Sequence, residues 1–244
     1  MKRAAGEQDR VADNALFALP SLQMAAHELK APLTLVRQLS HAIASGDYTA
    51  EQVQQIAERI GLTSDRALRL TTDLTRSARL DDGLFELEPI DPMPLCLDVI
   101  GELAPLYAAR GRELRLARRR NNVPLVVAHR DLLRRIMINF ADNALHYAEG
   151  DRPVELSVVY QRRPEVIRLS VRDYGPSLAR DLRAHLRSQE LASQIAYRPA
   201  SSGLGLYISQ QFANAMGAKV GALAHRDGAS FYVDVPRSAQ LGLW

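Results

Sequence analysis

A histidine followed by a glutamate, His27-Glu28, is the part of this sequence best suited to chemistry, and a proline follows five residues after the histidine. A neutral imidazole is a nucleophile near neutral pH. An adjacent carboxylate can orient it and accept its proton as a bond to phosphorus forms. Pro32 removes a backbone donor and crowds the carbonyl of Glu28, so we expect a loosened helix there. The stretch alone fits an ordinary surface histidine equally well.

Two long helices are expected around this pair, over residues 14–45 and from residue 49 to about 81–83. In both, apolar residues recur every seven positions, which is the pattern of a left-handed helical bundle. His27 lies about 140° around the helix from Leu22 and should face outward. Thr49 to Gln52 resembles a capping box. The repeating positions are Leu22, Leu29, Val36 and Ile43 in the first helix and Val53, Ile60, Ala67 and Leu74 in the second.

A short turn between two such helices predicts an antiparallel hairpin over residues 14–83. Two helices cannot enclose their own apolar seam, so we predict a homodimer that forms a four-helix bundle. Residues 80–86, which include Gly83, are the expected hinge to a second domain over residues 84–244.

Composition limits the remaining possibilities. The 244 residues are 47% hydrophobic and 24% charged, with a net charge of +3. No apolar run reaches the roughly 18 residues of a membrane span, so we expect a cytoplasmic protein or the cytosolic portion of an inner-membrane protein. A single cysteine, Cys96, excludes an internal disulfide. The arginine-rich residues 110–120 fit a solvated strand and loop better than a nucleic-acid site.

The second domain reads as one mixed sheet covered by helices on one face. Helices are expected at residues 93–110 and 131–148, and another after a glycine-rich turn that follows a lid-like helical stretch. Strands are expected at residues 84–88, 113–117, 123–127, 154–160, 166–171, 219–224 and 230–235.

Three short motifs in this domain suit nucleotide binding. Asn139 and Asn143 stand four residues apart, on one face of a helix. Asp173-Tyr174-Gly175 ends a strand, and Gly203 and Gly205 lead into a helix, whose N-terminus can bind phosphate. Each is weak alone, because spaced asparagines are usually helix-surface residues and Asp-Tyr-Gly-Pro is a turn signal.

Together with the histidine, these motifs resemble those of the two-component sensor histidine kinases. Residues 27–33 resemble the H box, and residues 138–147, 171–176 and 201–208 resemble the N, G1 and G2 boxes in the same order, so that the resemblance covers residues 20–237. It implies a multidomain protein, in which an α-helical hairpin is followed by an α+β two-layer sandwich of the Bergerat or GHKL ATPase type.

The resemblance also implies roles for single residues. His27 would be phosphorylated from ATP with Glu28 as base, and would pass the phosphoryl group to an aspartate of a response-regulator receiver domain. Asn143 would ligate Mg²⁺, and Asp173 would accept a hydrogen bond from adenine. The other implied ATP-binding residues are Asn139, His146, Tyr147, Gly175, Arg198, Ser202, Gly203, Leu204, Gly205 and Leu206.

Several positions depart from the family. Ala31 stands where bifunctional members carry Thr or Asn to orient water, which predicts weak phosphatase activity. Ser177 replaces a glycine, and no phenylalanine lies between Gly175 and Gly203, so that Leu178, Leu182, Leu186 and Leu191 are candidate lid anchors. His129 replaces an acidic residue.

One alternative is therefore a degenerate kinase that serves as a nucleotide-binding dimeric scaffold or phosphotransfer module. Another is an ATPase that acts through motion, although it would make poor use of His27.

Overall fold

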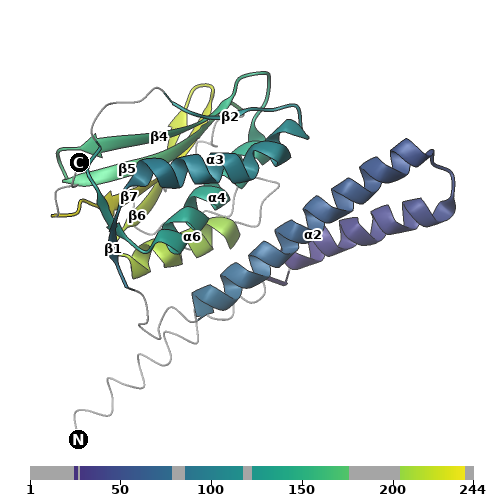
Figure 1. Ribbon diagram of the computed structural model, residues 1–244, viewed down its shortest axis with the longest axis horizontal. Helices are drawn as coiled ribbons and strands as arrows, with labels where there is room; N and C mark the ends of the chain where they lie inside the picture. The colour runs from purple at the N-terminus through teal and green to yellow at the C-terminus, as the bar shows by residue number, and fades with distance from the viewer. Residues whose placement is uncertain (1–24, 27, 79–85, 118–122, 176–203, 240–244) are drawn as a thin grey trace, which may run out of the picture. The chain divides into compact units, whose positions relative to one another are not determined.

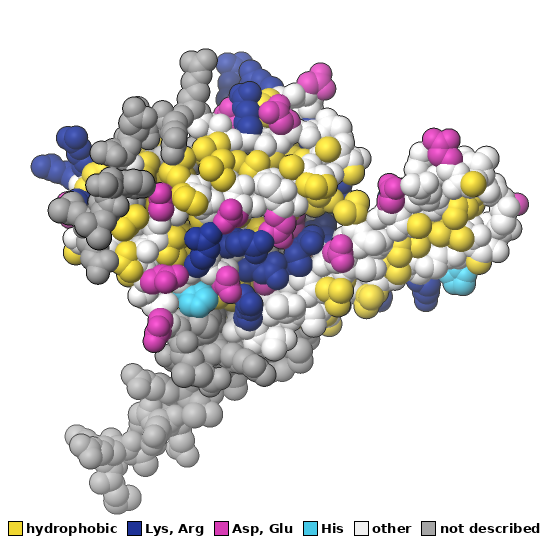
Figure 2. Space-filling model, viewed as in Figure 1, with side chains coloured by type: hydrophobic (Ala, Val, Ile, Leu, Met, Phe, Trp, Pro, Cys, Tyr) yellow, Lys and Arg dark blue, Asp and Glu magenta, His cyan; other side chains and the backbone are white. Residues whose placement is uncertain are grey.

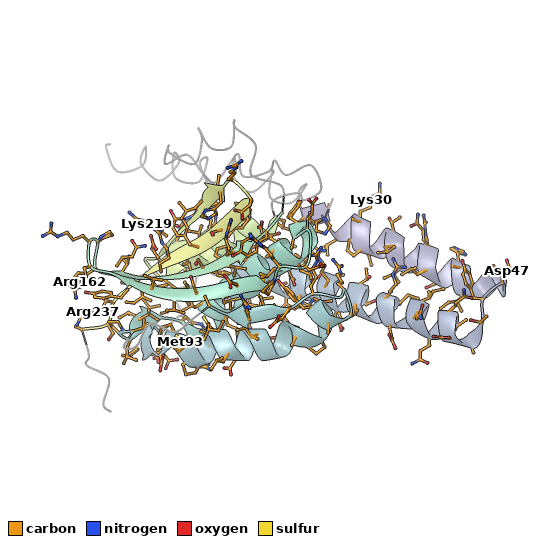
Figure 3. All side chains as sticks on the ribbon, turned by 90° about the horizontal axis from the view of Figure 1, so that it is seen from above. Lys30, Asp47, Met93, Arg162, Lys219 and Arg237 are labelled. Atoms are coloured by element: carbon orange, nitrogen blue, oxygen red, sulfur yellow. The ribbon has the colours of Figure 1, made fainter. Side chains whose placement is uncertain are left out.

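The computed structural model describes residues 25–26, 28–78, 86–117, 123–175 and 204–239. The chain divides into two compact units, Met1–Arg76 and Ser77–Trp244. In the first unit, residues 28–45 form an unbroken helix that runs through Pro32, and α2 spans Ala50–Ala78. The two helices run antiparallel (Figure 1), and Asp47 marks the turn between them (Figure 3). The helical hairpin is therefore confirmed, whereas residues 14–24 and the expected domain boundary at residue 83 lie outside the described part.

The turn of the hairpin has the local chemistry that the sequence predicts. Gly46 adopts a positive φ of 78° at the end of the first helix, a conformation that glycine reaches without steric cost. The backbone N–H of Thr49 donates to Gln52 Oε1 at 2.9 Å, and the N–H of Gln52 donates to Thr49 Oγ1 at 3.3 Å. This reciprocal pair is the predicted capping box, and it satisfies two donors at the start of α2.

The heptad seam is the least exposed part of the hairpin. Every described seam position is partly or fully buried, as the seven-residue repeat predicts. Other large apolar side chains stay exposed on the same unit, among them Leu33 at 60% and Leu68 at 66%. Figure 2 shows hydrophobic side chains gathered along its visible face. Exposed apolar surface on a two-helix unit is typical of a surface that packs against a partner.

The second unit is built on a five-stranded mixed sheet with the order β2-β4-β5-β7-β6. The short β2 pairs in parallel with β4, and the other neighbours are antiparallel. The strands are β2 (Leu114–Leu116), β4 (Val154–Gln161), β5 (Val166–Asp173), β6 (Lys219–His225) and β7 (Gly228–Pro236).

The prediction of one single sheet is wrong. β1 (Glu88–Ile90) and β3 (Val126–Ala128) form a separate two-stranded antiparallel sheet. The strand expected at residues 84–88 also starts later, because residues 86 and 87 have no regular structure and residues 84 and 85 lie outside the described part. Pro92 already begins the next helix, which limits β1 to three residues, and Pro89 within it has no N–H to donate to a partner strand.

Three helices cover one face of the large sheet, as Figures 1 and 3 show. They are α3 (Pro92–Ala108), α4 (Arg130–Tyr147) and α6 (Leu204–Ala215). Burial alternates along β4 and β5, since every second side chain points into the core beneath these helices. Within the described residues, no helix is both long and apolar enough to cross a membrane.

Candidate nucleotide site

The helix α4 is the element around which the three predicted motifs gather. Its N-cap is His129, whose Nδ1 accepts a hydrogen bond from the backbone N–H of Leu132 at 3.4 Å. A carboxylate at an N-cap accepts in the same way. The residue that replaces the family's acidic one thus still supplies an acceptor for the first turn of α4.

The residues of the N box lie along the last two turns of α4. Asn139 is 9% exposed and faces the interior, whereas Asn143, one turn later, is only half-buried. His146 is exposed, and its ring meets the half-buried ring of Tyr147 edge-on with 5.0 Å between centroids. Polar and aromatic groups therefore line the C-terminal half of the helix, where the resemblance expects phosphates and base.

The G1 motif follows β5, the central strand of the sheet. Asp173 is completely buried, and its Oδ1 accepts a hydrogen bond from the backbone N–H of Ala229 at 3.0 Å. The start of β7 approaches so closely that a Cβ on Gly228 would lie 2.2 Å from the Asp173 carbonyl oxygen. Gly228 also has a φ of 136°. The carboxylate is thus held in place from the neighbouring strand.

The loop after β5 packs directly on the end of α4. A Cβ on Gly175 would lie 2.0 Å from the carbonyl oxygen of Tyr147. Beside it, the N–H of Glu149 donates to the carbonyl of Tyr174 at 2.7 Å. Only glycine fits at this backbone contact, which brings the G1 loop against the N box.

The G2 motif reaches α4 from the other side. The Nδ2 of Asn139 lies 3.3 Å from the carbonyl oxygen of Gly205, in the first turn of α6. Leu204 and Leu206 are buried among the core residues. A nucleotide at this turn would therefore meet backbone N–H groups rather than these two side chains, as at other phosphate-binding helix starts.

Of the remaining predicted site residues, some lie within the described part of the chain and others lie outside it. His27, Arg198, Ser202 and Gly203 lie outside the described residues, as do Ser177 and the four candidate lid leucines. Glu28 is described as a half-buried residue of the first helix. The structure thus brings together the described members of the N, G1 and G2 boxes, and the roles of all site residues remain predictions.

Sequence reasoning missed the residues that hold these motifs in place. One example is Ser209, a second is the start of β7 at Gly228 and Ala229, and a third is Tyr107 of α3. Its buried hydroxyl donates to the carbonyl oxygen of Ala141 at 2.7 Å, between the two asparagines. Burial raises the pKa of Tyr107, and the charges of Asp142 and Asp173 raise it further, so the hydroxyl stays a neutral donor. An Asp-Gly turn signal was available for residues 227–228, but no local pattern indicated the partners of Tyr107 or Ser209.

We expect Tyr107→Phe to lower the free energy of unfolding by about 1 kcal/mol, because it removes one buried hydrogen bond and little else. Urea unfolding followed by circular dichroism measures this change. Tyr160→Phe is the matched control, since its hydroxyl meets only Arg237 at an exposed site, and we expect a much smaller change. Equal losses in the two variants would contradict a special role for the bond to Ala141.

No group of three or more His, Cys, Asp or Glu side chains among the described residues is placed to hold a metal ion. Mg²⁺ prefers oxygen ligands and commonly keeps several waters while it binds substrate phosphates. The half-buried Asn143 offers such an oxygen.

Comparison with known proteins agrees with this geometry. Residues 128–239 match the family described as "Histidine kinase-, DNA gyrase B-, and HSP90-like ATPase". This part of the chain is therefore an ATPase domain of that family.

The chain is also 27% identical over 220 residues to the adaptive-response sensory kinase SasA of Prochlorococcus marinus, covering 88% of this chain and 58% of that protein. It is likewise 27% identical over 226 residues to the signal transduction histidine-protein kinase BaeS of Escherichia coli, covering 88% and 46%. Over most of its length the chain is thus similar to proteins named as sensory or histidine kinases.

Solved structures agree on the fold. Full-length ShkA in complex with AMPPNP superposes with a TM-score of 0.60 at 27% identity, covering 90% of this chain and 46% of that one. The kinase ThkA in complex with the response regulator TrrA gives 0.62 at 18% identity, covering 98% and 67%. Both structures cover at least 90% of this chain, so the folds of the helical unit and of the second unit occur together in solved structures. The chain spans about half the length of the first curated relatives that it matches.

Proposed function

We propose that this chain is the dimerisation and catalytic core of a sensor histidine kinase. It binds ATP in the unit Ser77–Trp244 and transfers the γ-phosphoryl group to a ring nitrogen of His27. The observation that supports this most is the convergence of three motifs on α4: Gly175 lies against Tyr147, Asn139 is bonded to Gly205, and buried Asp173 ends the central strand. The same chain carries the His27-Glu28 pair.

The chemistry follows from these residues. The unprotonated nitrogen of His27 attacks the γ-phosphorus, the bond to the bridging oxygen of ADP breaks, and Glu28 takes the proton from the other ring nitrogen. Asp173 accepts a hydrogen bond from the adenine amino group. Asn143 would hold Mg²⁺, which supplies positive charge to the phosphate oxygens. Phosphohistidine then passes its phosphoryl group to an aspartate of a response-regulator receiver domain.

Labelling with γ-labelled MgATP tests this proposal. We expect acid-labile, base-stable label on the wild-type protein and none on Asn143→Ala. Asn214→Ala is the matched control, because this exposed amide of α6 accepts its hydrogen bond from Gln210 of the same helix, and it should keep the label. Nucleotide binding without any label would overturn the kinase in favour of a nucleotide-binding scaffold.

A homodimer is the proposed assembly. The helical unit leaves Leu33, Leu68 and other large apolar side chains exposed, and a second hairpin would cover such a surface in a four-helix bundle. We expect light scattering to give about twice the chain mass of 27.1 kDa. A monomer at micromolar concentration would contradict this assembly.

Weak phosphatase activity is the expected consequence of Ala31. This residue lies on the exposed side of the first helix, one turn after position 27, and has no group that could orient water. Ala31→Thr should speed dephosphorylation of a receiver domain, previously phosphorylated by this kinase, by about ten-fold, which corresponds to one hydrogen bond in the transition state. If the wild type is already as fast as the variant, the expectation is wrong.

A further inference from the structure

The amide of Asn139 bridges two helices that are far apart in sequence. Its Nδ2 lies 3.3 Å from the carbonyl oxygen of Gly205 and 3.4 Å from the hydroxyl oxygen of Ser209. A carbonyl oxygen can only accept, so the nitrogen of the amide, and not its oxygen, must face α6. The orientation of the Asn139 side chain is therefore determined by α6.

Three hydrogen bonds link Asn139, Gly205 and Ser209. The hydroxyl of Ser209 donates to the Gly205 carbonyl at 2.7 Å, which leaves its lone pair to accept from Asn139. Ser209 is completely buried, so water does not compete for these bonds. The two acceptors are themselves only 2.7 Å apart, so they lie in nearly the same direction from Asn139 Nδ2, and one N–H group directed between them can serve both.

We infer that Asn139 and Ser209 are a pair of positioning residues that attach the first turn of α6 to α4. On this inference, which rests on the proposed function, Asn139 acts on the nucleotide through the placement of the α6 N-terminus. Backbone N–H groups at that turn bind phosphate only when the helix start is correctly placed. Ser209 thereby becomes a determinant of nucleotide affinity although it lies beneath the site.

Hydrogen exchange in the nucleotide-free protein tests the structural half of the inference. We expect the amides of residues 208 and 209, which reach the carbonyls of Leu204 and Gly205, to exchange about ten-fold faster in Ser209→Ala and in Asn139→Ala, because each variant loses a bond to the first turn. Gln210→Ala is the control, since this side chain bonds to Asn214 within the same helix. Unchanged exchange at residues 208 and 209 in both variants would overturn the inference.

A double-mutant cycle on AMPPNP affinity tests the functional half. We expect each single variant to weaken binding about five-fold to ten-fold, and the double variant to be no weaker than the worse single one, because the two side chains act as one unit. If Asn139→Ala weakens binding equally in the wild-type and Ser209→Ala backgrounds, Asn139 acts directly on phosphate and the inference fails. A wild-type protein that binds no nucleotide would refute the proposed function. The hydrogen-exchange result would still show whether Asn139 and Ser209 attach the first turn of α6 to α4.

Discussion

Replacing His27 by alanine is expected to abolish the acid-labile label entirely, while affinity for AMPPNP stays within about two-fold of wild type. The imidazole is the proposed nucleophile, and neither alanine nor a neighbouring residue provides another ring nitrogen. Nucleotide binding is proposed for the other compact unit, Ser77–Trp244, so it should survive. The experiment measures label from γ-labelled MgATP beside the binding of a fluorescent ATP analogue displaced by AMPPNP.

His41→Ala is the matched control for this prediction. His41 is an exposed histidine on the same helix, fourteen residues beyond position 27. The control variant should keep full labelling, because only the histidine beside Glu28 has a carboxylate next to it in sequence. Label that persists in His27→Ala and disappears in His41→Ala would show that the phosphoacceptor is His41, which would contradict our proposal.

The second large effect is expected from Gly175→Ala. The new Cβ would lie 2.0 Å from the carbonyl oxygen of Tyr147 and 3.0 Å from its carbonyl carbon. Both partners are backbone atoms, so a side-chain rotation cannot relieve the clash, and the loop after β5 must move away from α4. We expect a loss of stability of about 1–3 kcal/mol and a ten-fold to hundred-fold weaker affinity for AMPPNP.

Two other glycine variants serve as controls for this clash. A Cβ on Gly205 would meet Asn139 Cγ at 3.9 Å, an ordinary contact, so Gly205→Ala should leave stability nearly unchanged. A Cβ on Gly101, in the exposed face of α3, meets nothing within 4 Å, and Gly101→Ala should leave nucleotide affinity unchanged. Urea unfolding and AMPPNP titration separate the two effects. A Gly175→Ala protein as stable as Gly205→Ala would show that the loop accommodates a side chain.

Local patterns predicted the elements more accurately than their pairing. The capping box of Thr49 and Gln52 follows from residue types three positions apart, and the structure confirms it. The helix α4 was expected at residues 131–148 and is observed at Arg130–Tyr147. These features depend on neighbours within one turn of helix, which a single sequence displays directly. The assignment of β1 to the large sheet failed, because the partner of a three-residue strand is chosen by the tertiary fold.

By itself, the sequence determined the motifs, their order and the resemblance to sensor histidine kinases. Only the tertiary structure decided which residues hold those motifs. Asp173 meets Ala229 across 56 positions, and Asn139 meets Ser209 across 70. The first contact depends on the register that pairs Asp173 with Ala229 between β5 and β7, and the second on the packing of α4 against α6. Register and helix packing are set by the burial of whole faces at once, so no short stretch of sequence carries this information.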